Sequence, residues 1–148
     1  MEVLYGQSVV LRPLQKEYFN AYLRAFSPLV RQLLHVSKLS SEAAYLYHSL
    51  ERQSPRNPFY CIFDRTSDDV IGAIQLRDRD TYHGQLYCWI NEGYWGTTYF
   101  KQALELVMHH YFEDNAVLYI NAHVDSTNAR AYQALRKCGF ADCGIYKG

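Results

Sequence analysis

The sequence predicts a mixed α/β domain in which helices flank a central, mostly antiparallel sheet. The order of periodic segments predicts it: a strand, two or three helices, three strands, a helix, a strand, a helix and a final strand. The chain has 148 residues, and 49% of them are hydrophobic, which is enough for a core. We therefore expect one domain over residues 1–148, with antiparallel hairpins first and a β-α-β unit second.

The first part of the chain predicts a strand, a group of helices and a hairpin. Val3 to Arg12 predicts a strand that stops at Pro13, because proline cannot donate to a ladder. Apolar spacing predicts helices over 16–26, 29–35 and 40–53, the last with Ser40 as its N-cap. The remaining segments are expected to form strands at 59–63 and 70–76, a turn at 64–69, and a loop or ragged strand end at 77–84.

The second part predicts two strand–helix pairs and a closing strand. Alternation over 85–91 predicts a strand with Trp89 and Ile90 on opposite faces. A helix is predicted over 97–114, because its apolar residues recur at helical spacing. We expect the other elements to be a strand at 117–124, a helix at 128–138 that ends at Gly139, and a strand at 140–146.

Composition narrows the class of protein. Lys and Arg balance Asp and Glu at 15 each, so the chain has no basic excess for a nucleic-acid partner. The four cysteines form no CxxC pair and have no zinc-ligand spacing with histidine, so we expect reduced thiols and no metal. No basic leader and no long apolar run is present, which predicts a cytoplasmic protein that does not bind membranes.

Two segments carry the chemistry. Asn91 to Phe100 holds two glycines and opens a helix, where unpaired N–H groups and the helix dipole favour an anion. Asn128 to Phe140 follows about thirty residues later. Together the two segments indicate a cofactor with a diphosphate and an extended arm. The GxGxxG and Gly-Lys-Ser/Thr motifs are absent, which argues against a Rossmann dehydrogenase and a P-loop ATPase.

The order of elements and four short motifs resemble the GCN5-related N-acetyltransferase (GNAT) superfamily, and within it the RimJ/RimL-like branch, which acetylates ribosomal-protein N-termini. The motifs are Val10-Leu11-Arg12-Pro13-Leu14, Val70-Ile71-Gly72-Ala73-Ile74, Trp95-Gly96-Thr97-Thr98-Tyr99 and the segment from Asn128 to Phe140. The resemblance covers almost the whole chain.

The resemblance implies that acetyl-CoA is the acyl donor and that no metal takes part. Its diphosphate would lie on the backbone N–H groups of Trp95, Gly96, Thr97, Thr98 and Tyr99. Its pantetheine arm would pair with the strand edge at Trp89 and Ile90, with Asn128 on the other side. A backbone N–H near Ile90 would then polarise the thioester carbonyl.

The sequence departs from the family pattern at several positions. Gly93 stands where Gln or Arg is frequent, Thr98 replaces a second glycine, and Leu135 stands where many members have a tyrosine. The sequence given also stops eight residues after Phe140, where most members have one more strand, so we expect this sequence to be cut short, the last strand to be absent, or another chain to supply it. An edge left open in this way would favour a homodimer.

The resemblance implies direct attack of an amine on the thioester, with the acceptor a small molecule or a protein N-terminus. Glu92, at the end of the flanking strand, is the candidate base; the alternative is a solvated carboxylate at a helix start. Tyr132 is the candidate proton donor to the thiolate; the alternative is a packing tyrosine. The alternative function is a weak or inactive module that binds CoA or a protein partner.

Overall fold

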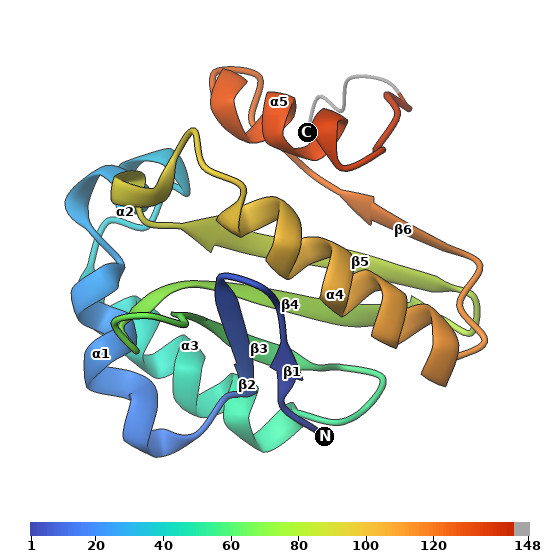
Figure 1. The fold of residues 1–148 in the computed structure, drawn as a ribbon, viewed down its shortest axis with the longest axis horizontal. Coiled ribbons are helices and arrows are strands. Elements are labelled where there is room, and N and C mark those ends of the chain that lie inside the picture. The colour runs from blue at the N-terminus through green and yellow to red at the C-terminus, as the bar shows by residue number, and fades with distance from the viewer. Residues whose placement is uncertain (144–148) are drawn as a thin grey trace.

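A computed structural model describes residues 1–143 of the chain (Figure 1). The strands are β1 (Leu4–Tyr5), β2 (Val9–Pro13), β3 (Phe59–Asp64), β4 (Val70–Asp80), β5 (His83–Ile90) and β6 (Tyr119–Ala122). The helices are α1 (Phe19–Ala25), α2 (Pro28–Leu33), α3 (Leu39–Arg52), α4 (Tyr99–Asp114) and α5 (Ala129–Lys137). Two short 3₁₀ helices are η1 (Lys16–Tyr18) and η2 (Glu92–Tyr94).

Within residues 1–143, six strands form one sheet in the order β1-β2-β3-β4-β5-β6. Neighbouring strands run antiparallel except β5 and β6, which are parallel and are connected through α4. A parallel pair needs such a crossover, whereas the earlier strands are joined by turns or by the helices that precede β3. The predicted fold class, a mostly antiparallel sheet flanked by helices, is confirmed.

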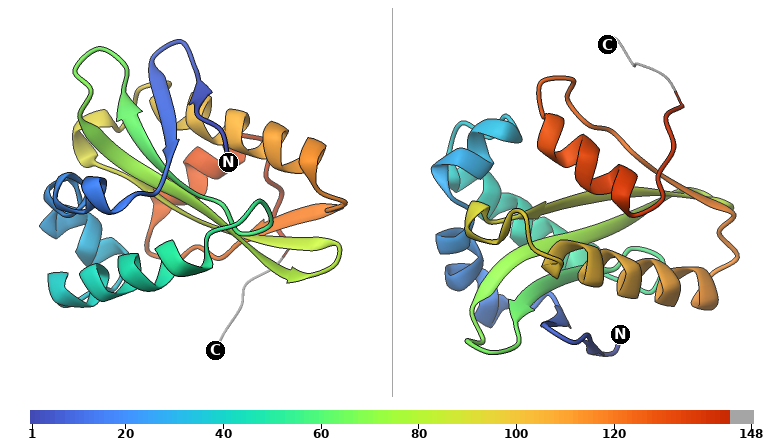
Figure 2. Two further views of the ribbon diagram at one scale, coloured as in Figure 1. Left: turned by 90° about the horizontal axis from the view of Figure 1, so that it is seen from below. Right: turned by 45° about the horizontal axis from the view of Figure 1, so that its top comes forward.

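Helices cover both faces of the sheet (Figure 2). The first face packs against α4 and α5 in a cluster that includes Leu86 and Ile90, and the second packs against α1, α2 and α3 in a cluster that includes Trp89. Successive side chains of β5 therefore enter different cores, as the predicted alternation required. The end of β5 is the point from which both cores can be reached.

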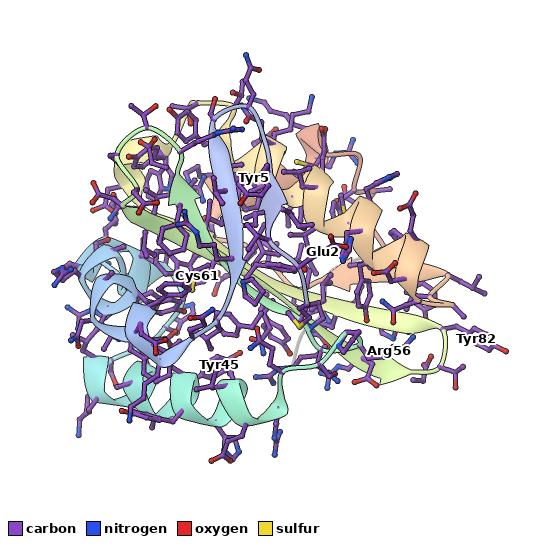
Figure 3. The ribbon with its side chains drawn as sticks, turned by 60° about the horizontal axis from the view of Figure 1, so that its bottom comes forward. Glu2, Tyr5, Tyr45, Arg56, Cys61 and Tyr82 are labelled. Carbon is purple, nitrogen blue, oxygen red and sulfur yellow. The ribbon has the colours of Figure 1, made fainter. Side chains whose placement is uncertain are left out.

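The largest difference from the sequence prediction is the β4–β5 hairpin, which replaces the loop predicted at 77–84. Arg77 pairs with Gln85 across the ladder, so β4 continues to Asp80 and β5 begins at His83. The Arg56 guanidinium donates to the carbonyl oxygen of Asp80 at 2.8 Å and steadies the tip, near the labelled Tyr82 (Figure 3). The polar composition of this segment reflects its exposure to solvent, since residues 77–80 pair with β5 but lie beyond the ladder with β3.

Several predicted boundaries also change. The first strand is split into β1 and β2 by a turn in which the Gly6 N–H donates to the Val9 carbonyl at 2.8 Å. The N-cap of α3 is Lys38 rather than Ser40, and α4 begins at Tyr99. Residues 140–143 form no strand, so the beginning of the predicted strand at 140–146 is wrong, and 144–146 lie outside the described residues.

Candidate active site

The sheet opens at the end of β5. The parallel ladder with β6 ends at the pair of Leu86 and Ala122, while β5 continues for four residues, 87–90, paired with β4 on its other side. Beyond Ala122 the chain leaves the sheet and runs to α5. A cavity of about 450 Å³ occupies this opening and is lined by residues of both clusters, including Trp89, Ile90 and Asn128.

The backbone of β5 presents an unpaired edge to the cavity. The N–H of Asn91 donates to the Ile71 carbonyl of β4 at 2.8 Å. Because N–H groups alternate along a strand, those of Cys88 and Ile90 point the opposite way, toward the side where β6 has ended. Within residues 1–143 the free edge thus consists of the N–H groups of Cys88 and Ile90, whereas the N–H of Trp89, predicted to share this edge, faces β4.

Gly72 lets the two central strands approach each other behind this edge. A Cβ at Gly72 would lie 2.4 Å from the carbonyl oxygen of Trp89 and 3.1 Å from the Cα of Ile90. Both contacts are with backbone, which cannot swing aside as a side chain can. The glycine of the second predicted motif therefore sets the position of the β5 backbone.

The loop before α4, named the cradle from here on, leaves its backbone open at the start of a helix. Gly96 has a φ of +79° and no atom within 4 Å of a Cβ built on it, so its backbone is open to a ligand. In the part of the chain that the structure describes, the N–H groups of Gly96, Thr97 and Thr98 have no acceptor. They lie at the positive end of a sixteen-residue helix.

The threonine hydroxyls of this loop hold its shape. The Thr97 hydroxyl donates to the Tyr94 carbonyl at 2.6 Å and accepts from the Tyr99 N–H at 3.3 Å. The Thr98 hydroxyl accepts from the Gln102 side chain at 2.9 Å. The β-branched residue at Thr98 is thus anchored toward α4, and the backbone of the loop stays accessible.

Trp95 and Arg130 form the wall between the cradle and the cavity. The Trp95 indole N–H donates to the Ile90 carbonyl at 3.1 Å, and the Arg130 guanidinium lies 4.3 Å from the centroid of the Trp95 ring. Among residues 1–143 the Arg130 Nε is buried without an acceptor, and burial lowers the pKa of this side chain. A buried guanidinium nitrogen beside an anion cradle is a ready donor for phosphate.

The sequence analysis missed Arg130, although the residue stands two positions after Asn128 in the closing motif. Asn128 itself is 8% exposed and lines the cavity. Its side-chain oxygen accepts from the Ala131 N–H at 3.2 Å, which caps α5. Asn128 and the cap thus place Arg130 at the cavity wall.

The two predicted catalytic side chains lie elsewhere. The Glu92 carboxylate accepts from the Ser27 hydroxyl at 2.6 Å at the start of α2. The Tyr132 hydroxyl donates to Asp142 at 2.7 Å on the exposed side of α5. Neither residue is among those that line the cavity.

A different carboxylate lies in the cavity wall. Glu42, on α3, accepts from the Tyr22 hydroxyl at 2.6 Å, and that hydroxyl accepts from the Trp89 indole N–H at 3.0 Å. Burial raises the pKa of Glu42, and the bond from Tyr22 offsets part of this shift. No sequence pattern predicted this cluster, because a glutamate in the first turn of a helix is expected to stabilise the helix start.

A cationic group lies in the wall of the same cavity. Arg77 donates to the Tyr45 hydroxyl at 2.7 Å, and its guanidinium lies between the rings of Tyr45 and Tyr87, at 5.2 and 4.9 Å from their centroids. The Tyr45 hydroxyl also donates to the Gln75 side chain. Figure 3 labels Tyr45, on the side of α3 that faces the sheet. All four side chains line the cavity.

Residues 1–143 contain no group of three or more His, Cys, Asp or Glu side chains arranged to hold a metal ion. None of the helices in this range combines the length and the apolar character needed to cross a membrane.

The fold is shared with solved acetyltransferases. An enzyme from Salmonella typhimurium described as modifying the N-terminal serine of ribosomal protein L7/L12 aligns with a TM-score of 0.83, at 14% identity, over 97% of this chain and 87% of that one. A GNAT-family acetyltransferase from Bacillus anthracis aligns with a TM-score of 0.80, at 12% identity, over 97% and 86%. RimL, described as a ribosomal L7/L12 α-N-protein acetyltransferase in complex with coenzyme A, aligns with a TM-score of 0.76, at 15% identity, over 93% and 82%.

Sequence comparison assigns the family more directly. No functionally curated protein matches the chain. The family model of the acetyltransferase (GNAT) domain matches residues 8–141, which include the free edge of β5, the cradle before α4 and the cap of α5. The chain therefore belongs to the GNAT acetyltransferase family.

Proposed function

We propose that this protein transfers an acetyl group from acetyl-CoA directly to an amine. The observation that carries the proposal is the continuity of the free edge of β5 with the cradle at Gly96. The first offers backbone hydrogen bonds to an extended arm, and the second offers N–H groups to an anion. Few ligands other than a CoA thioester combine an extended arm with an anionic diphosphate.

The residues present fit this ligand. Gly96, Thr97 and Thr98 would hold the diphosphate through their N–H groups, and Arg130 would pair with a phosphate through its buried Nε. Cys88 and Ile90 would pair with the pantetheine amides through their backbone. That a relative of the same fold is described in complex with coenzyme A supports this placement.

The chemistry follows from the position of Ile90. When bound, acetyl-CoA supplies a thioester carbonyl carbon that a neutral amine can attack. The N–H of Ile90 would donate to the carbonyl oxygen as negative charge develops on it, which is an oxyanion-hole contribution. The new C–N bond forms as the C–S bond breaks, and no group of the enzyme becomes acylated.

Calorimetric titration tests the cofactor part of this proposal. We expect CoA and acetyl-CoA to bind one site with a Kd on the order of 1–100 μM, and pantetheine, which lacks the diphosphate, to bind at least about tenfold more weakly. Absence of CoA binding to the folded chain would overturn the proposal. Release of free thiol from acetyl-CoA, dependent on an added amine, tests the transfer itself.

A further inference from the structure

The wall of the cavity below α3 carries an unneutralised carboxylate. Glu42 is 9% exposed, and the hydroxyl of Tyr22 is the partner that the structure gives its carboxylate. Within residues 1–143 it forms no ion pair. A carboxylate that lines a cavity and has no cationic partner is a place where a ligand can supply the cation.

The same wall carries an unneutralised cation. Arg77 contacts the Tyr45 hydroxyl and two aromatic rings, and in the described part of the chain it forms no ion pair with a carboxylate. Guanidinium groups bind carboxylates through two parallel hydrogen bonds. The aromatic rings on both sides hold the group in place without satisfying its donors, which leaves it available to an anionic ligand.

Tyr45 brings these two charges together. It lies three residues after Glu42 on α3, so both side chains lie on one face of the helix. Burial raises the pKa of its phenol, the charge of Arg77 lowers it, and the charge of Glu42 raises it. The Tyr45 hydroxyl accepts from Arg77 at 2.7 Å, and Tyr45 lies one helical turn from Glu42, so one tyrosine of the cavity wall links the guanidinium to the helix that carries the carboxylate.

We propose that Glu42 binds the amine of the acceptor and accepts a proton from it, and that Arg77 binds an anionic group of the same molecule. The acceptor would then be an amine that also carries a carboxylate, as a free α-amino acid does. This inference rests on the proposed acetyl transfer, and assigns to Glu42 the role that the sequence analysis gave to Glu92. A protein N-terminus fits less well, because its α-carboxyl group is part of a peptide bond.

The proton balance is as follows. An α-amine is mostly protonated at neutral pH and must lose a proton before it can attack. The Glu42 carboxylate takes that proton and later releases it to solvent. The neutral amine forms the C–N bond, the thiolate leaves, and the second amine proton passes to the thiolate. One proton is released for each amide formed.

Four variants separate the two roles from structural effects. Glu42→Gln keeps the shape and the bond to Tyr22, and Glu51→Gln is its control on the exposed part of the same helix. Arg77→Gln removes the guanidinium, and Arg79→Gln is its control two residues farther along β4, in an exposed position. CoA affinity is measured by calorimetry for every protein, so a failure of the cofactor site is seen independently of the acceptor.

The acceptors are α-amino acids, the corresponding amino acid amides and short peptides. With Glu42→Gln we expect kcat to fall about 100-fold with CoA affinity unchanged. With Arg77→Gln we expect KM for amino acids to rise at least about tenfold while the amides are unaffected, and the two controls should behave as the native protein.

Three results would overturn the inference while leaving the CoA site intact. The first is native-like turnover by Glu42→Gln. The second is a native protein that prefers amides or peptides to free amino acids. The third is CoA binding without turnover of any amino acid across the panel. Loss of CoA binding in the native protein would instead overturn the proposed function.

Discussion

The two halves of the cavity are built from different parts of the chain. The cofactor half consists mainly of backbone: the edge of β5 and, beside the cavity, the N–H groups of Gly96, Thr97 and Thr98. The acceptor half consists of side chains from α1, α3, β4 and β5, and its bond between Trp89 and Tyr22 joins residues 67 positions apart. Changes of backbone conformation should therefore damage the cofactor half. Removal of single polar atoms should damage the acceptor half.

Gly96→Glu should produce the largest effect in the cofactor half. Because nothing lies within 4 Å of a Cβ at Gly96, the variant should fold, but it places a carboxylate where phosphate would bind and disfavours the positive φ. We expect CoA affinity to fall about 100-fold or more, which corresponds to about 2.7 kcal/mol. Calorimetric titration measures the change.

Gly139→Glu is the matched control. Gly139 also has a positive φ, +94°, and open space around it, but it follows the end of α5, whereas Gly96 precedes the start of α4. Both variants should lose a similar amount of stability, while only Gly96→Glu should lose CoA. Equal CoA affinity in the two variants would argue against the cradle.

Tyr22→Phe should produce the largest effect in the acceptor half. The variant removes the hydroxyl that joins Trp89 to Glu42, and so leaves a buried N–H donor and a carboxylate without this partner. We expect the free energy of unfolding in urea to fall by about 1–3 kcal/mol, with CoA affinity nearly unchanged. Tyr47→Phe, at a side chain on α3 that is 51% exposed, should cost far less. Equal losses in both variants would contradict a buried network.

The difference between a half built from backbone and a half built from side chains also explains which features could be predicted from the sequence. The fold class and the face assignment of Trp89 and Ile90 followed from periodicity, because alternation and burial are local properties. The strand pairing at 77–84 did not, because hydrogen bonds between polar strands leave no hydrophobic pattern. The loop at Gly96 could be predicted as a candidate anion site because its backbone N–H groups belong to residues that are adjacent in the sequence.

The acceptor half was not recognised for the opposite reason. Glu92 was the natural candidate base because it follows β5 directly, yet Ser27 holds its carboxylate at the start of α2. Glu42 lies 47 residues before Trp89, and only the packing of α3 and α1 on the sheet brings them together. Assembly of this kind depends on tertiary structure that periodicity does not specify.

Arg130→Gln should give a smaller effect and shows whether the cofactor half also depends on a side chain. Loss of a charge-assisted bond to phosphate should weaken CoA binding about tenfold and reduce its sensitivity to salt. Arg136→Gln, on the exposed side of the same helix, should leave affinity unchanged. Native affinity in Arg130→Gln would mean that backbone alone holds the diphosphate.

The smallest expected effect is a change in how stability depends on pH. Burial raises the pKa of Glu42 above its ordinary value of 4.5, so above that pH the folded state binds more protons than the unfolded state. Stability due to this group is therefore full below the ordinary value and declines as pH rises through the folded pKa. Glu42→Gln, which does not ionise, should lack this decline.

Asp64→Asn should show the opposite sign. The hydrogen bond from the Tyr94 hydroxyl, at 2.6 Å, lowers the pKa of Asp64 below its ordinary value of 3.8. Its contribution is present above that value and lost as pH falls through the folded pKa. Urea unfolding of the native protein and both variants between about pH 3 and pH 8 measures how the free energy of unfolding depends on pH. Equal pH dependence in the native protein and Glu42→Gln would mean that folding does not raise the pKa of Glu42. Opposite slopes would show that the folded protein disfavours the charged form of Glu42, in the acceptor half, when no cationic ligand is bound. They would also show that it favours the charged form of Asp64, next to the start of the cofactor loop.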